Sequence, residues 1–259
     1  MQPEPRPTVL DRTSRHLPGR RGTDGASRSW AGERALLLGA FATPLRPVSR
    51  LTALLAVAVL VLETVGFTVR RACASSGCGG TGWASTWDMD ALGSVPRALV
   101  TLVLAAGAAV SLWGVRRSGR SGAGLWWLVL GLGCALLAAA KHSSLHSVVE
   151  VRLAGVLPGA DVQLLFVVVS ALGLAAVTVS GRWVRRETRT AVTTWLALYA
   201  LAGVGLAAVT IVLAHLGPVV ADLATLVEET GEGLAAVGLL AALLAGTREL
   251  AARGAGDEG

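Results

Sequence analysis

The sequence predicts an all-α fold, a polytopic integral membrane protein built as a six-transmembrane-helix bundle. Its composition is 53% hydrophobic and only 15% charged, which is too apolar for an ordinary water-soluble domain. Several apolar windows of about 18 to 20 residues are long enough to cross a hydrocarbon core of roughly 30 Å. Backbone polar groups must be satisfied within each segment in lipid, and no alternating pattern of barrel strands is visible. The windows are therefore expected to be helices.

The apolar windows define a transmembrane domain over residues 49–247. A basic, proline- and glycine-rich segment, 1–48, precedes it and shows little apolar periodicity, which is typical of a disordered tail. A short polar tail, 248–259, follows. The predicted spans are about 51–69, 98–115, 125–145, 162–180, 194–215 and 226–245.

The basic residues predict the orientation of the bundle. Of the 23 lysines and arginines, 18 lie in the N-terminal tail, the second and fourth loops and the C-terminus. The positive-inside rule then places both termini in the cytoplasm, with the plasma membrane as the expected location. The same rule explains the net charge of +6 without nucleic acid. Membrane lipids are the expected partners.

Two of the three cysteines lie close together in a loop on the predicted outer side. Four residues separate Cys73 from Cys78, and glycine and serine are frequent around them. In an oxidising compartment this spacing favours a disulfide over free thiols or a weak metal pair.

Ionisable residues gather at the predicted outer ends of the spans. His142, His146 and Glu150 are spaced four residues apart, so a single helix would place them on one face. The other members come from the first, third, fifth and sixth spans, whereas the second and fourth are expected to contribute none. They are Glu63, Lys141, His215, Glu228, Glu229 and Glu232. Ionisable groups cost a few kcal/mol each in hydrocarbon and usually face the bundle interior in pairs, so a shared polar cluster is expected.

One interpretation of this cluster is a zinc site. Imidazoles from His142, His146 and His215 with a carboxylate from Glu232 are ligands that suit zinc. Glu63 or Glu229 would then serve as the catalytic base toward a zinc-bound water.

The structural alternative assigns each group an ordinary role. The histidines would be solvated at a helix end, and Lys141 would be a counter-ion to Glu63 or to the acidic turn. Glu228, Glu229 and Glu232 would form the first turn of the sixth helix, where the helix dipole favours acids.

Histidines and acids converging on one membrane face from several helices resemble the ingredients of the alkaline ceramidase and adiponectin-receptor superfamily, whose members are seven-helix zinc hydrolases. Here H-x-x-x-H lies on the third of six spans, whereas that family carries its histidine pair near the last helix. Neither the family's activity nor its site residues are therefore transferred. The chain has no P-loop, dinucleotide fingerprint, G-x-S-x-G or H-E-x-x-H motif, which removes the usual soluble enzyme classes.

Three classes of function stay open from the sequence. The first is a multi-pass membrane protein in which the cluster is a structural or ligand-sensing core. The second is a zinc-dependent membrane hydrolase acting on a lipid-like substrate. The third is a transporter, or a haem protein with His146 and His215 as axial ligands.

Overall fold

The computed structural model describes residues 49–78, 82–144, 148–149, 152–153 and 159–256. The chain divides into two units, Met1–Gly39 and Ala40–Gly259, and every described residue belongs to the second. The predicted N-terminal tail, together with His146 and Glu150, lies outside the described residues.

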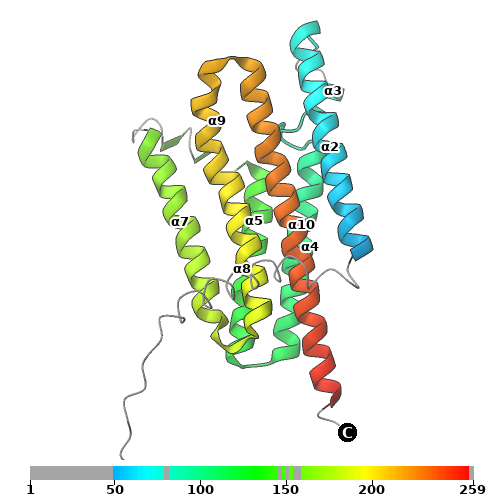
Figure 1. Ribbon diagram of the computed structural model, residues 1–259, viewed down its shortest axis with the longest axis vertical. Helices are drawn as coiled ribbons and strands as arrows, with labels where there is room; N and C mark the ends of the chain where they lie inside the picture. The colour runs from blue at the N-terminus through cyan, green and yellow to red at the C-terminus, as the bar shows by residue number, and fades with distance from the viewer. Residues whose placement is uncertain (1–48, 79–81, 145–147, 150–151, 154–158, 257–259) are drawn as a thin grey trace, which may run out of the picture. The chain divides into compact units, whose positions relative to one another are not determined.

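The described residues form helices and no strands, which confirms the all-helical prediction. Figure 1 shows the longer helices side by side in a bundle. In chain order they are α2 (Ser49–Ser76), α3 (Gly82–Trp87), α4 (Val95–Ser118), α5 (Gly122–Ser143), α7 (Gly159–Ser180), α8 (Arg186–Ala200), α9 (Ala207–Leu213) and α10 (Pro218–Gly256).

Local sequence explains where several helices begin and end. The Ser121 hydroxyl caps α5 by accepting a hydrogen bond of 3.2 Å from the backbone N–H of Gly124. α10 begins directly after Gly217, whose φ of 120° is one that residues with a side chain rarely adopt. Pro218 is its first residue, where a missing N–H costs no intrahelical hydrogen bond.

Helix α10 is the central element of the bundle. It packs against α2, α4, α8 and α9, and 61% of its most apolar window is buried, compared with 11% for α7. Two hydrophobic clusters use its side chains: Leu239 and Leu243 pack with Trp126 and Trp127 in one, and Ala236 and Leu240 pack with Leu104 in the other. Near its C-terminal end, Glu249 accepts a hydrogen bond of 3.3 Å from the Thr188 hydroxyl of α8.

Within the described ranges, five helices are long and apolar enough to cross a membrane: α2, α4, α5, α7 and α10. The predicted fifth span is instead built from several helix types. α8 continues into a π-helix, η2 (Leu201–Leu206), then α9, and then a 3-10 turn, η3 (Ala214–Leu216). No single α-helix over 186–216 is therefore as long as the others.

The sixth predicted span begins earlier than expected, because α10 starts at Pro218 and not near residue 226. Glu228, Glu229 and Glu232 therefore lie ten or more residues inside the helix. The interpretation of these acids as a first helical turn is wrong, since the dipole effect is confined to the terminal turn. α10 also continues to Gly256 through most of the predicted C-terminal tail.

Candidate functional site

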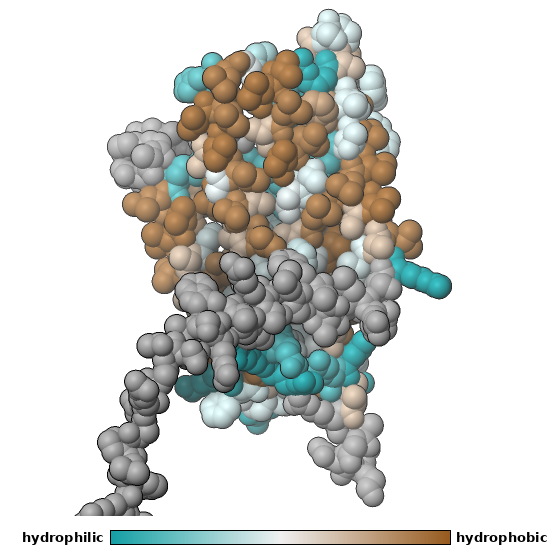
Figure 2. Space-filling model, viewed as in Figure 1, coloured by the Kyte–Doolittle hydropathy of each residue, from teal (hydrophilic) through white to brown (hydrophobic). Residues whose placement is uncertain are grey.

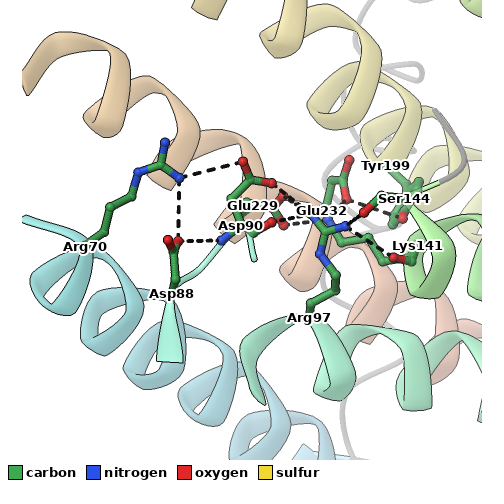
Figure 3. Close-up of polar contacts among 9 residues, drawn as sticks. All are labelled: Arg70, Asp88, Asp90, Arg97, Lys141, Ser144, Tyr199, Glu229 and Glu232. Carbon is green, nitrogen blue, oxygen red and sulfur yellow. Dashed lines mark hydrogen bonds and ion pairs between the residues drawn. The ribbon is translucent and has the colours of Figure 1, made fainter. Parts of the chain in front are cut away.

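The centre of the candidate site is Lys141, the only lysine of the chain, in the last turn of α5. Its Nζ lies 2.5 Å from Glu229 Oε2 and 2.6 Å from Glu232 Oε2 (Figure 3). Positions 229 and 232 are three residues apart on α10, so both carboxylates project from one face of the helix. The three side chains are between 4% and 11% exposed. One ammonium therefore bridges two carboxylates in the interior.

Arg97, in the first turn of α4, supplies a second buried cation. Its Nη2 lies 2.8 Å from Asp90 Oδ1 and 3.8 Å from Glu229 Oε1. Its Nη1 donates to the Ser144 hydroxyl, at the end of α5. The side chain is only 3% exposed. The expectation that the second span contributes no ionisable group is therefore wrong.

Asp90 connects this buried region to a more exposed group of charges. Arg70 of α2 lies 3.7 Å from Asp90 Oδ2 and 3.5 Å from Asp88 Oδ1. The Asp90 side chain as a whole is 47% exposed. Desolvation of its carboxyl group, and next the proximity of Glu229, raise the pKa of Asp90 above its ordinary value. The positive charge of Arg97 opposes this effect. Arg70 and Arg71 also both bond to Asp222 of α10 at 2.9 Å.

Glu63 lies in α2 and is 1% exposed. It forms no ion pair with any described residue, and its Oε2 has no hydrogen-bond partner among them. It is nevertheless close enough to interact electrostatically with Glu229, Lys141, Glu232 and Arg97. Glu63 is thus part of the same buried group of charges. We call Glu63, Asp90, Arg97, Lys141, Glu229 and Glu232 the charged core.

The π-helix adjoins the charged core. Tyr199, two residues before η2, places its hydroxyl 3.4 Å from Glu232 Oε2. A Cβ added to Gly203, within η2, would collide with Glu232 Oε1. A side chain at residue 203 would therefore require the Glu232 carboxylate to move from its present position.

Three of the four predicted zinc ligands, His142, His215 and Glu232, lie among the described residues. His142 and His215 are both exposed, whereas Glu232 is buried. Among the described residues, no group of three or more His, Cys, Asp or Glu side chains is arranged to hold a metal ion. Because consecutive helical residues point about 100° apart, burial of Lys141 turns the adjacent His142 outward. The described residues therefore provide no zinc site.

The predicted cysteine pair lies at the end of α2. Cys73, near the end of α2, forms a disulfide with Cys78, and their Cα atoms are 4.6 Å apart. A cavity of about 350 Å³ lies beside it, lined by Arg70, Cys73, Ala84 and Asp88 among others. Glu228 has an interacting partner and is half-buried on α10.

Asp90, Arg97 and Tyr199 were missed from the sequence, although the last two each carried a signal. Arg97 is one of only four arginines outside the segments predicted to be cytoplasmic, and it directly precedes an apolar run. Tyr199 is the only tyrosine in the chain and lies inside an apolar window. Both were open to assignment as flanking or belt residues, because the sequence does not show which way a helix faces.

The geometry is that of an ionic network that is buried except at Asp90. Two cations, Arg97 and Lys141, are set against four carboxyl groups: Glu63, Asp90, Glu229 and Glu232. Such a network can hold helices in register, bind a proton or couple charge movement to helix movement. Comparison with known proteins supplies no relative from which a role could be transferred, because no family model, no curated protein and no solved structure matches the chain.

Proposed function

We propose that the protein is a six-span membrane protein of the plasma membrane, with both termini in the cytoplasm. Large apolar side chains are exposed along its helices, among them Leu54, Leu102, Leu132 and Leu172, each more than 60% exposed. Figure 2 shows apolar side chains over most of the visible bundle. Exposure of such an apolar surface to water is unfavourable, whereas contact with lipid tails is not.

The broken helical segment 186–216 supplies the sixth span in this proposal. It is longer than the roughly 20 residues that a helical crossing needs. Its π-helix faces Glu232 and α10 rather than standing alone, and irregular backbone is tolerated at membrane depth where protein covers it. Membrane lipids are then the main partners, and the basic residues follow the positive-inside rule without nucleic acid.

Within this protein the charged core acts as the polar element that holds the helices in one arrangement. The observation that carries this role is Lys141 placed between Glu229 and Glu232, with Arg97 near the other oxygen of Glu229. These contacts join α4, α5 and α10, and Tyr199 adds α8. A buried charge that loses its partner is left uncompensated, so any other packing of these helices is disfavoured.

Cysteine labelling tests the insertion and its direction. Ser85 of α3 and Ser121 before α5 are both exposed, and the proposal places them on opposite sides of the membrane. A membrane-impermeant maleimide should label Ser85→Cys in intact cells and Ser121→Cys only after lysis, with the parent chain as the background control. Labelling of both variants in intact cells, or recovery of the protein in the soluble fraction, would contradict the proposal.

Transport of a small ion is a second candidate, favoured by the π-helix. Single-turn π-segments occur often at functional sites, and transporters bind their ions where helices are interrupted. Here η2 places Gly203 against a buried carboxylate, and α4 adds Arg97 to the same region. Ion flux into liposomes containing the protein, compared with the Glu232→Gln variant, tests this role. Equal flux for the two would argue against it.

A further inference from the structure

Glu63 is the one member of the charged core that forms no ion pair with a described residue. The residue is 1% exposed, and its Oε2 has no hydrogen-bond partner among the described residues. An ionised carboxylate in this position would carry a large desolvation cost, and Lys141 and Arg97 offset it only in part because neither forms an ion pair with Glu63.

The cations near Glu63 are already engaged. Lys141 lies between Glu229 and Glu232 at 2.5 and 2.6 Å, and Arg97 lies 2.8 Å from Asp90. Two long helices, α4 and α10, pack against α2, and both carry charged groups that interact with Glu63. These groups are Arg97 on α4 and Glu229 and Glu232 on α10. Lys141 on α5 also interacts with Glu63. α3, which also contacts α2, carries no charged residue. If Glu63 were ionised, it would therefore be a fourth carboxylate, beside Asp90, Glu229 and Glu232, around the two cations Arg97 and Lys141.

We propose that Glu63 is a proton-binding site, whose carboxyl carries a proton in the folded protein at neutral pH. This inference goes beyond the holding role of the charged core and rests on that core being buried. Loss of the proton would set a new carboxylate in competition with Glu229 and Glu232 for Lys141. Proton release from α2 is thereby coupled to the contacts that hold α5 against α10.

The surroundings favour a proton over a metal cation as the ligand. Sodium and calcium are held by several oxygen atoms, whereas the carboxylates near Glu63 are Glu229 and Glu232, which already bind Lys141, and Lys141 and Arg97 add positive charge to the same region. The described residues contain no group of acidic or histidine side chains arranged for a metal. A proton needs only the one carboxyl group.

Dicyclohexylcarbodiimide tests this assignment, because this apolar reagent modifies protonated carboxyl groups in apolar surroundings. The full-length protein in detergent micelles is treated at acidic, neutral and alkaline pH, and the modified residue is identified by mass spectrometry of peptides. We expect the label on Glu63 at neutral pH, a decrease as the pH rises, and little label on Glu229 or Glu232. The label should disappear in Glu63→Gln. Micelles make the result independent of the direction of insertion.

Thermal unfolding gives a second readout that does not depend on reagent access. Glutamine is close in shape and charge to a protonated glutamate, so Glu63→Gln should keep the Tm of the parent at neutral pH. Glu232→Gln is the matched control on the same core and should lower the Tm, because it removes a partner of Lys141. An equal drop for both variants, or the absence of label on Glu63 in the parent, overturns the proposal. Protection of Glu63 by sodium but not by choline would assign the site to a metal cation and also overturn it.

Discussion

Replacing Lys141 with methionine removes the central cation while keeping a side chain of similar length. The ammonium contacts Glu229 at 2.5 Å and Glu232 at 2.6 Å, and all three side chains are at most 11% exposed. Breaking a buried ion pair by removing one partner typically costs about 3–5 kcal/mol, because a charge is left uncompensated. A chain of this size shifts its Tm by roughly 2–4 °C per kcal/mol, so we expect Lys141→Met to unfold about 10 °C below the parent.

The assay is thermal unfolding of detergent-purified protein at neutral pH and one heating rate, because unfolding of such proteins is often irreversible. Arg116→Met is the matched control, since it removes an exposed positive charge and should change the Tm by little. The triple variant Lys141→Met with Glu229→Gln and Glu232→Gln should recover most of the loss, because no unpaired charge remains. A Tm for Lys141→Met within about 2 °C of the parent would refute the reasoning, since it corresponds to less than about 1 kcal/mol.

Further substitutions probe the neighbourhood of the core. Gly203→Val should lower the Tm more than Gly133→Val, because a Cβ at residue 203 collides with Glu232, whereas a Cβ at residue 133 meets open space. Equal effects would contradict a close contact between the π-helix and Glu232. Replacing Cys73 and Cys78 together by serine should cost at most about 2 kcal/mol, since the closed loop is short, and reducing agent should lower the Tm of the parent but not of this variant. The raised pKa of Asp90 means that the folded state binds its proton more tightly than the unfolded state. The stabilisation that Asp90 contributes is thus fully present below the ordinary pKa of Asp and is lost as the pH rises through the raised pKa. Asp90→Asn should remove this change from a profile of Tm against pH. An unchanged profile would contradict a raised pKa for Asp90.

Hydropathy predicted the helices well because length and apolar character are written directly in the chain. The limits of α4 and α7 differ from the predicted spans by no more than a few residues. The predicted start of the sixth span, near residue 226, came eight residues too late, although proline fits the first helical position.

The prediction of the site depended on helix rotation, which a single sequence does not reveal. Lys141 and His142 are adjacent and equally polar, yet the first is buried and the second exposed. Isolation in apolar sequence was enough to single out Lys141, Glu63 and Glu229. It could not show that His142 and His215 are exposed, so the same residues supported a metal site as well as an ionic one.

The unbroken length of α10 places mechanical limits on the molecule. Glu232 meets Lys141 toward one end of this helix, and Glu249 meets Thr188 toward the other, about 25 Å along the axis. A continuous helix transmits rotation along its whole length. Any rotation of α10 that draws Glu232 away from Lys141 therefore also displaces Glu249 from Thr188. Breaking the contact at the charged core then changes a contact near the other end of the helix.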